Sequence, residues 1–382
     1  MEGLTDHRQL ARTTDDGVCF TLARPEHDEA IRRLLRENAM AGAISVSFER
    51  EPSYFAGAVM PAENEVTLLA FGGKRLLAMG RCVTRSCWLD GRIARVGYLS
   101  ELRLDHSATD RLRILRGGYE FLRQIEKSNP ADFYFTSISA DNHRARRLLE
   151  RGVRGLPRYE FLTDYTTLVL DVHRTRRFSK MKELRFEFAT TAHVDQLVAL
   201  LNDFGARAQL TSVWSAERLK ALVHHGLKLE NIQLAFVGDR LVGCAGMWDQ
   251  RAVRQTVIRG YSTSLKLARP FLNLAARLAG TVRLPRVGAV VDHGHVFPFA
   301  LSREASEVLI PLISASARSA GKCGLRLLTL GFPSRDPQLQ RLRKQFGGHV
   351  YRTRFYQVKW PEIQTAFGPK PDHPFMPEAA LL

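Results

Sequence analysis

The sequence has few of the features that mark secreted, metal-binding or membrane-spanning proteins. Its five cysteines are an odd number, and no two of them form a Cys-x-x-Cys pair, so we expect neither a disulfide framework nor a zinc site. The apolar runs fall short of the roughly 20 residues that a spanning helix needs. The N-terminal residues MEGLTDHRQLARTTDDG contain no apolar signal segment. These absences predict a cytoplasmic protein with free thiols, no membrane span and no metal.

Acidic residues are scarce relative to basic ones. The chain has 56 Lys and Arg against 39 Asp and Glu, which gives a net charge of +17 at pH 7. Its apolar fraction of 45% and charged fraction of 25% are typical of a globular protein and argue against disorder. The excess charge therefore bears on partners. It is consistent with a solvated surface, with attraction to the phosphates of a cofactor, or with a nucleic-acid or membrane surface.

A length of 382 residues favours two domains, and the expected elements repeat. In the first half, a helix follows Pro25, and the other helices are expected at 112–127 and 143–151, with strands at 18–23, 66–71, 76–88, 93–104, 133–139 and 159–170. In the second half, helices are expected at 192–204, 215–225, 264–278, 303–320 and 336–346, with strands at 184–189, 232–237, 241–248, 289–301, 325–330 and 350–360. The matching order predicts a duplicated α/β domain with a mixed (α+β) sheet.

The expected boundaries follow from this repeat. Residues 1–17 form a leader, 18–170 the first domain, 171–183 a basic linker, 184–360 the diverged second domain, and 361–382 a Pro-rich tail.

The most informative stretch is 96–122, VGYLSELRLDHSATDRLRILRGGYEFL. It predicts a strand, a polar loop rich in arginine, two glycines and a helix. A helix N-terminus presents unpaired N–H groups and a partial positive charge, which suit a phosphate. Glycine allows close approach of the backbone, and arginine adds charge-assisted hydrogen bonds. The stretch therefore predicts a site for a phosphate-bearing cofactor.

Two motifs and the element order resemble the GNAT N-acyltransferase family. Read from Arg113, the sequence Arg113-Ile-Leu-Arg116-Gly117-Gly118 resembles the family's R/Q-x-x-G-x-G/A region. Asn142-x-x-Ala145-x-x-Leu148 resembles the asparagine-led helix of many members. The whole chain looks like a tandem of two such domains. The resemblance implies transfer of an acyl group from acetyl-CoA or another acyl-CoA to the amine of a small molecule or peptide.

The resemblance also implies the cofactor-binding residues. The end of the strand would bind the pantetheine arm, and the loop and helices would bind the phosphates. The expected residues are Leu102, Arg103, Leu104, Arg111, Arg113, Arg116, Gly117, Gly118, Asn142 and Arg146. In the second domain the corresponding Ser302-Arg303-Glu304-Ala305-Ser306 lacks the motif and carries an acidic residue, so we expect the cofactor in the first domain.

Acyl transfer to an amine needs a base and an acid. Glu101 resembles the strand glutamates that act as base in some GNAT enzymes. Tyr159, or alternatively Tyr165, is the candidate acid. Tyr98 lies three residues before Glu101, and strand alternation places it on the opposite face, in the core.

Other patterns and functions stay open. Asp292-His293-Gly-His295 could provide metal ligands or an acid–base pair, because the two histidines share a strand face. The helix at 264–278 carries one apolar stripe, for which core or lid packing, a dimer contact and membrane contact are the alternatives. The rival functions are a non-catalytic binding module built from degenerate GNAT domains, and an aminoacyl-tRNA-dependent transferase. A nucleic-acid partner is possible but not favoured.

Overall fold

A computed structural model describes residues 11–15, 17–57, 62–174, 184–360 and 373–382. Most of the expected leader, most of the expected linker and residues 361–372 of the expected tail lie outside these ranges. None of the described helices is long and apolar enough to cross a membrane. The described residues also include no group of three or more His, Cys, Asp or Glu side chains arranged to hold a metal ion.

The N-terminal unit, taken here as β1 to β8, begins within the expected leader. Its strands are β1 (Ala11–Thr13), β2 (Val18–Leu22), β3 (Ile44–Glu49), β4 (Asn64–Gly72), β5 (Arg75–Leu89), β6 (Arg92–Leu104), β7 (Phe133–Ser139) and β8 (Arg158–Asp171). Its helices are α1 (Asp28–Glu37), α2 (Arg111–Glu126) and α3 (His143–Leu149). The turn between β5 and β6 has positive φ at both Asp90 and Gly91, as the Asp-Gly hairpin signal predicts.

The C-terminal unit, β9 to β16, repeats this order. Its strands are β9 (Leu184–Phe188), β10 (Thr211–Ser212), β11 (Gln233–Val237), β12 (Arg240–Trp248), β13 (Gln255–Tyr261), β14 (His293–Leu301), β15 (Leu327–Pro333) and β16 (His349–Lys359). Its helices are α4 (Val194–Ala206), α5 (Ala216–His224), α6 (Thr263–Leu278), α7 (Leu309–Lys322) and α8 (Pro337–Phe346), and the short helix η8 (Ala379–Leu381) follows. The added pair β13–α6 interrupts the repeat between β12 and β14.

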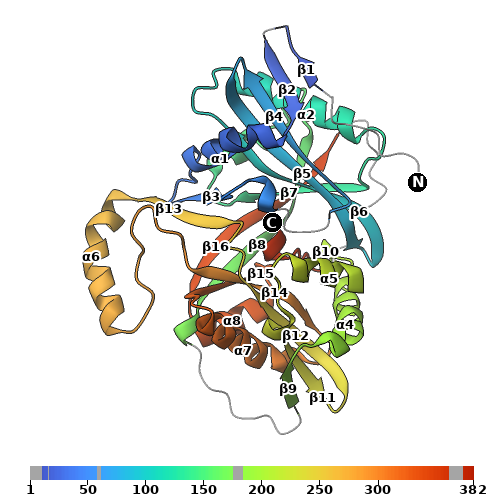
Figure 1. Cartoon of the computed structure of the whole chain (residues 1–382), viewed down its shortest axis with the longest axis vertical. Coiled ribbons are helices and arrows are strands. Elements are labelled where there is room, and N and C mark those ends of the chain that lie inside the picture. The colour runs from blue at the N-terminus through green and yellow to red at the C-terminus, as the bar shows by residue number, and fades with distance from the viewer. Residues whose placement is uncertain (1–10, 16, 58–61, 175–183, 361–372) are drawn as a thin grey trace.

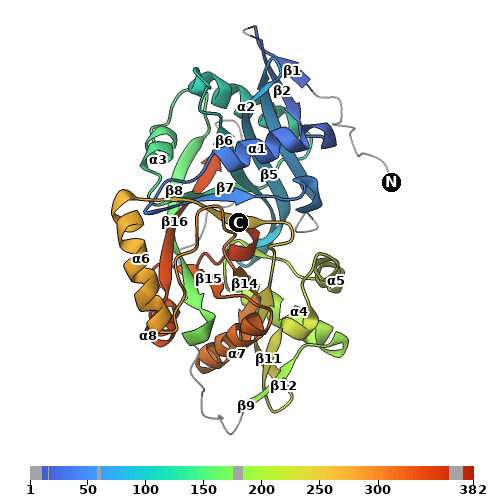
Figure 2. The ribbon, with the colours of Figure 1, turned by 60° about the vertical axis from the view of Figure 1, so that its left-hand side comes forward.

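Within the described residues, one 14-stranded mixed sheet runs through both units (Figures 1 and 2). Its order is β1-β2-β4-β5-β6-β7-β16-β8-β15-β14-β12-β11-β9, with β10 added beside β5. The last long strand of the chain, β16, lies between β7 and β8 and is antiparallel to both. Strand β8 in turn pairs with β15 of the C-terminal unit. The two units therefore exchange their final strands, which joins them into one sheet.

Helices cover both faces of the sheet. In the N-terminal unit, Leu69 of β4 packs with α1, whereas its neighbours Leu68 and Ala70 pack with α2. Because side chains alternate along a strand, α1 and α2 lie on opposite faces. In the C-terminal unit, Val242 of β12 packs with α7, and its neighbour Leu241 packs with α4 and α5.

The structure corrects several sequence-based predictions of elements. Strands β1, β3, β10 and β13 were not predicted. Strand β3 pairs with β13, and β10 with β5, so these strands are recognised from partners far away in the chain. The described end of the expected extended tail is packed, since Met376, Ala380 and Leu381 are buried. The prediction that the helix at 264–278 packs in the core or as a lid was wrong, because no residue of α6 is buried.

Candidate functional site

Strands β6 and β7 diverge in the middle of the sheet. They run parallel and pair only at Val96 to Leu99 with Phe133 to Thr136. At the last pair, Thr136 Oγ1 donates to the Leu99 carbonyl at 2.7 Å. Beyond it β6 stays paired with β5, and β7 with β16, but the described residues form no further β6–β7 pairs. The facing edges therefore offer backbone hydrogen-bonding groups to an extended ligand.

A bulge in β6 marks the point of divergence. Met79 of β5 lies opposite Arg103, whereas Arg81 lies opposite Ser100, so β6 has one residue more than β5 in this interval. Within the bulge Glu101 has a φ of 53°, which is uncommon for a residue other than glycine. Bulges that bend a strand and reorient a side chain are frequent beside active sites.

The bulge turns Glu101 into a buried cationic cluster. Its carboxylate accepts hydrogen bonds from Arg50 Nε at 3.0 Å and from the Tyr54 hydroxyl at 2.9 Å, and Arg50 Nη2 donates as well. Arg81 Nη1 lies 4.0 Å away. Burial by itself would raise the pKa of Glu101, but the charges of Arg50 and Arg81 outweigh it and hold the pKa well below its usual range. Glu101 is therefore an anion that carries little basicity.

This arrangement corrects the prediction that Glu101 and Tyr98 occupy opposite faces. Tyr98 lies opposite Val83 of β5, and Arg81 is two residues from Val83 on the same strand. The side chains of Tyr98, Val83 and Arg81 therefore share one face of the sheet. Glu101 contacts Arg81 on that face. The bulge adds one residue and so reverses the alternation on which the prediction depended.

A second part of the cluster comes from the C-terminal unit. Arg254 donates to the carbonyls of Ala380 at 3.2 Å and Leu382 at 2.7 Å. Burial lowers the pKa of Arg254 to about 10, and repulsion from Arg50 adds to this effect while Glu101 opposes it. Arg254 is thus within electrostatic reach of Arg50 and Glu101 at the bulge, and its two hydrogen bonds hold the C-terminal residues.

The two histidines of the Asp292-His293-Gly-His295 pattern contact each other at 5.3 Å between ring centroids, and the positive charge of Arg254 acts on both. His295 Nδ1 lies 2.7 Å from Thr329 Oγ1. Burial, His293 and Arg254 together lower the pKa of His295 well below its usual value. Burial is also the main reason for the lowered pKa of His293. Both lowered pKa values favour the neutral imidazole at physiological pH and make each histidine a weaker base than an exposed one.

The residues of the cluster that sequence reasoning missed are Arg50, Tyr54, Arg81 and Arg254. None of them belongs to a local motif. A buried arginine cannot be recognised in a chain with so many exposed ones, and only the carboxylate of Glu101 brings three of these four side chains together.

Helix α2 begins at the expected place, but a protein carboxylate occupies its first turn. The helix starts at Arg111, and Asp110 Oδ1 accepts a hydrogen bond from the Arg113 N–H at 3.1 Å. In the preceding loop, Asp105 accepts from the Ser107 N–H and from Arg75 Nη2, each at 2.8 Å. The N-cap carboxylate takes one of the N–H groups that a phosphate would use.

The two glycines lie in the second turn of α2 and have a packing role. A Cβ on Gly117 would overlap the Phe20 ring of β2, whereas a Cβ on Gly118 would lie 3.9 Å from the same ring. Gly117 therefore lets α2 approach the sheet closely. Both glycines lie inside the helix, within the expected range 112–127, and form no turn at its start, because the helix begins six residues before Gly117.

The predicted arginines have several different partners. Arg103 Nη1 donates to the Leu102 carbonyl at 3.0 Å, at the strand edge that faces the opening. Arg111 donates to the carbonyls of Ala108 and His106 in the loop. Arg116 instead donates to the Arg154 carbonyl at 2.8 Å and ties α2 to the loop that follows α3.

The remaining predicted cofactor residues belong to α3 and its start. Asn142 is the N-cap of α3 and accepts from the Ala145 N–H at 3.1 Å, as its position in the sequence predicts. Arg146 Nη1 donates to the Ala140 carbonyl at 3.0 Å.

Tyr159 lies in the core of the N-terminal unit. It packs in the cluster beneath α2, and its hydroxyl hydrogen-bonds to that of Tyr119. Burial is the main cause that raises its pKa well above the usual value. Glu101 lies on the other face of the sheet, with Tyr54 of the α1 side. Tyr165, the alternative acid, donates to the Pro377 carbonyl at 2.8 Å.

The C-terminal unit has a similar divergence that its own chain fills. Strands β14 and β15 pair only at His293 to His295 with Leu327 to Thr329. Beyond these pairs, a space of only about 40 Å³ remains between residues of both strands and Met376 to Ala379. Helix η8 contacts both strands. The opening between β6 and β7 is therefore the better candidate for a cofactor site.

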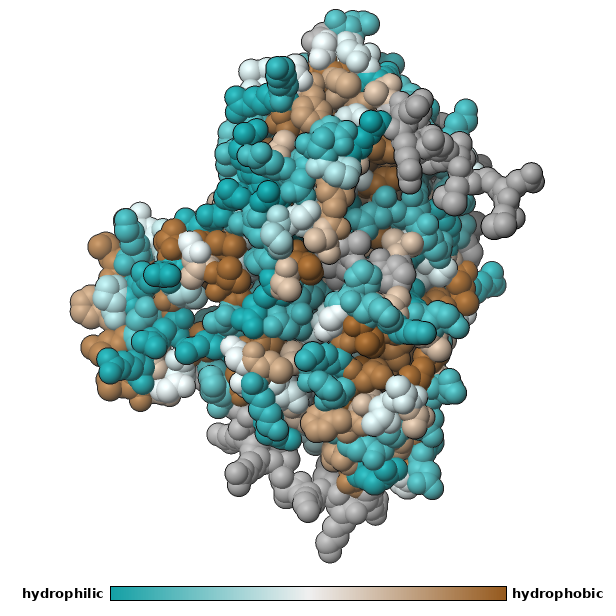
Figure 3. All heavy atoms as spheres, in the orientation of Figure 1, coloured by the Kyte–Doolittle hydropathy of each residue, from teal (hydrophilic) through white to brown (hydrophobic). Residues whose placement is uncertain are grey.

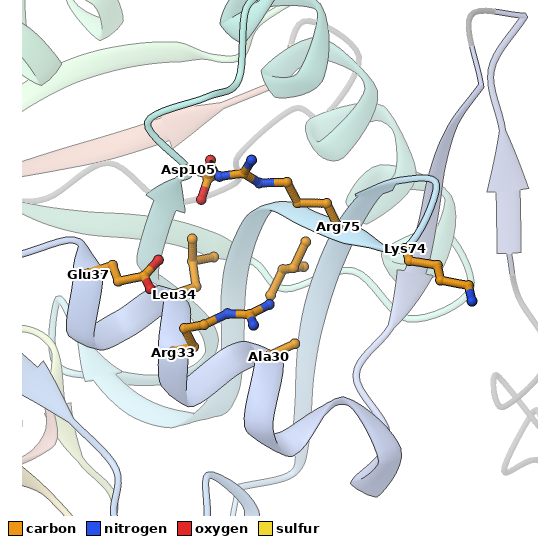
Figure 4. Close-up of a pocket in the computed structure, with 8 residues that line it drawn as sticks. Ala30, Arg33, Leu34, Glu37, Lys74, Arg75 and Asp105 are labelled. Carbon is orange, nitrogen blue, oxygen red and sulfur yellow. Dashed lines mark hydrogen bonds and ion pairs between the residues drawn. The ribbon is translucent and has the colours of Figure 1, made fainter.

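A surface pocket of about 440 Å³ lies at the end of β6 (Figure 4). It is formed by α1, the β4–β5 turn and Asp105, and it is lined by Ala30, Arg33, Leu34, Glu37, Lys74, Arg75, Leu76 and Asp105. Arg75 points toward Asp105, whereas Lys74 extends away from the pocket. The charged residues that line this pocket include both acidic and basic side chains.

Comparison with known proteins reveals similarity in structure but not in sequence. No protein-family model matches the chain, and no curated protein matches it. A GCN5-related N-acetyltransferase from Sphaerobacter thermophilus is similar over 94% of this chain and 100% of that one, with a TM-score of 0.56 and 14% identity. N-Myristoyltransferase from Saccharomyces cerevisiae, solved with bound myristoyl-CoA, is similar over 91% of this chain and 79% of that one, with a TM-score of 0.58 and 11% identity. The chain therefore has the GNAT N-acyltransferase fold over nearly its whole length, as its motifs and element order predicted.

Proposed function

We propose that this chain is an acyl-CoA-dependent N-acyltransferase whose cofactor site is the opening between β6 and β7. The observation that carries the proposal is the divergence of these strands at the Glu101 bulge. The backbone edge at Leu102, Arg103 and Leu104, where Arg103 Nη1 donates to the Leu102 carbonyl, would pair with the amides of the pantetheine arm, as an added strand does. The cofactor supplies the activated acyl group.

The phosphates would be held mainly by side chains. Arg103, Arg111 and Arg113 flank the end of β6 and the start of α2. Because Asp110 caps the helix, charge-assisted hydrogen bonds from the arginines would outweigh those from backbone amides. Asn142 and Arg146 would then support the cofactor through the position of α3, and Gly117 and Gly118 through the packing of α2.

The base and the charge-stabilising groups would come from the cationic cluster. Glu101 was predicted as the base, but a carboxylate with a depressed pKa accepts a proton poorly. We assign it the positioning of Arg50 and Arg81. His295, which is neutral, is the remaining candidate to take the proton of the amine, although its lowered pKa also limits its basicity, and the guanidinium of Arg254 is the candidate to stabilise negative charge on the acyl oxygen. Tyr159, on the opposite face, would keep a packing role.

Calorimetry with acetyl-CoA and with myristoyl-CoA tests the cofactor site and compares acyl lengths. We expect Arg103→Ala and Arg113→Ala each to weaken binding by about 5–30-fold, the loss of one charge-assisted hydrogen bond. Arg303→Ala, in the corresponding place of the C-terminal unit, is the matched control and should leave binding unchanged. Absence of binding at millimolar concentrations of both thioesters would rule the proposal out in favour of a non-catalytic pair of GNAT domains.

The net charge of +17 supports a second candidate, an aminoacyl-tRNA-dependent transferase. Binding of a tRNA to a basic protein releases counterions and weakens steeply with salt. A tRNA complex that weakens with salt, together with no binding of either thioester, would favour this candidate.

A further inference from the structure

Helix α6 projects from the body of the molecule (Figures 1 and 2). Its neighbour β13 pairs with β3 in a separate two-stranded sheet. The chain returns from α6 through residues 279–292, and Val290 forms a bridge with Val257 of β13. We call residues 261–291 the arm.

Hydrogen bonds and a ring contact within the arm hold it in a defined shape. Asn273 of α6 holds the returning chain at Leu284, with one hydrogen bond to its carbonyl at 3.0 Å and one from its N–H at 2.7 Å. The Tyr261 hydroxyl donates to the Pro285 carbonyl at 2.5 Å, and the Arg269 guanidinium lies over the Tyr261 ring. These contacts fix how α6 is presented.

The base of the arm is tied to the N-terminal unit. Arg259 of β13 forms an ion pair with Glu49 of β3. Gln255 donates to the Glu51 carbonyl at 2.9 Å, and its side-chain oxygen accepts from the Glu51 N–H at the same distance. The orientation of α6 is therefore held from both ends of β13.

The outer face of α6 is a stripe of large apolar side chains. Leu267, Phe271, Leu274 and Leu278 follow one another at helical spacing, and they are 72%, 76%, 57% and 82% exposed. Figure 3 shows hydrophobic residues on the projecting arm. Contiguous apolar surface of this kind, held out into water, marks an interaction site.

The charge of the arm is all of one sign. It carries Lys266, Arg269, Arg277, Arg283 and Arg286, and residues 261–291 include no Asp or Glu. Lys266 and Arg277 are exposed on α6, and Arg283 and Arg286 are exposed on the returning chain. The partner that complements this surface is apolar and negatively charged.

We propose that the arm docks on an anionic lipid membrane, with α6 lying in the plane of the interface. An apolar stripe flanked by Lys and Arg has the composition of interfacial helices, whose basic residues contact anionic headgroups. A second copy of the arm would instead bring two sets of five positive charges together. The projecting position allows the stripe to reach a flat surface. The proposal is independent of acyl transfer.

Co-sedimentation of the full chain with vesicles tests the proposal. The vesicles are phosphatidylcholine alone, or phosphatidylcholine with added phosphatidylserine. We expect binding to the mixed vesicles, weaker binding as salt is raised, and little binding to the neutral ones. Failure to bind the mixed vesicles, or equal binding to both kinds, would overturn the proposal.

Two variants locate the contact. Phe271→Ser/Leu278→Ser removes part of the stripe, and Lys266→Glu/Arg277→Glu reverses charges without touching it. Each should weaken binding by about tenfold or more. The control Ile93→Ser/Val237→Ser removes exposed apolar residues outside the arm and should bind as the unaltered chain does. Equal losses in control and arm variants would contradict the proposal.

Sedimentation velocity without vesicles separates membrane docking from self-association. Concentration-dependent dimers that Phe271→Ser/Leu278→Ser abolishes would identify a second copy as the occupant and overturn the proposal. A monomer over the whole range, together with vesicle binding, supports it. All substituted side chains are exposed, and circular dichroism verifies that the variants are folded.

Discussion

Arg50 and Glu101 form a buried ion pair at the residue where β6 bulges and leaves β7. The side chain of Arg50 is 4% exposed and that of Glu101 is 15% exposed, so the pair is largely shielded from solvent. The same carboxylate neutralises part of the charge of Arg81. The single carboxylate of Glu101 thus offsets part of the positive charge of two arginines, Arg50 and Arg81.

Glu101→Gln should therefore destabilise the protein strongly. The substitution keeps the shape of the side chain but removes the negative charge from the buried ion pair with Arg50, which typically costs about 3–5 kcal/mol. Glu65→Gln is the matched control, because Glu65 also pairs with Arg81, at 2.8 Å, but is 29% exposed. Its expected cost is about 1 kcal/mol. Urea unfolding measures both, and equal costs would show that the bulge pair has no special role.

Gly117→Ala should destabilise the fold, because the added Cβ would overlap the Phe20 ring. We expect a loss of about 1–3 kcal/mol from overpacking. Gly118→Ala, one residue further along α2, has room for its Cβ and should be neutral or stabilising by up to about 1 kcal/mol, since alanine favours helix. Thermal unfolding compares the two variants. If both kept full stability and lost acyl-CoA binding, the glycines would line the cofactor site directly.

The stability of the protein should fall as the pH drops below about 6.5, the usual pKa of histidine in an unfolded chain. In the folded state the pKa of buried His295 is lowered, chiefly by desolvation. The neutral form therefore stabilises the folded state at a pH above the pKa of histidine in the unfolded chain. This stability is lost as the pH falls toward the lower pKa of the folded state, by up to about 1.4 kcal/mol per pH unit. His295→Gln should flatten the dependence between pH 7.5 and 5.5. His224→Gln, at the exposed end of α5, should leave it unchanged.

Tyr165→Phe should loosen the residues that fill the gap between β14 and β15. The hydroxyl of Tyr165 donates to the Pro377 carbonyl, and its loss leaves a buried acceptor unpaired, at a cost of about 1–3 kcal/mol. Limited proteolysis followed by mass spectrometry should detect faster cleavage within residues 373–382. Tyr351→Phe, at a partly exposed tyrosine of β16, is the control. Unchanged cleavage in Tyr165→Phe would show that apolar packing alone holds this segment.

Much of the fold could be predicted because it is encoded by residues close together in the chain. The strand expected at 133–139 is β7 as observed, and the helix expected at 112–127 differs from α2 by one residue at each end. Asn142 caps α3, at the start of the helix expected at 143–151. Hydrophobic period and helix caps act over a few residues, so they can be recognised without knowledge of the partner strand or helix.

By itself the sequence determined the repeated order of helices and strands, and with it the GNAT fold and the place where β6 leads into α2. Only the tertiary structure decided what surrounds that place. Three features depend on residues far apart in the chain. They are the bulge that turns Glu101 toward Arg50, the packing of the Phe20 ring against Gly117, and the insertion of β16 beside β7. The same holds for the exposed stripe of α6, because periodicity shows that a helix has an apolar face but not whether another element covers it.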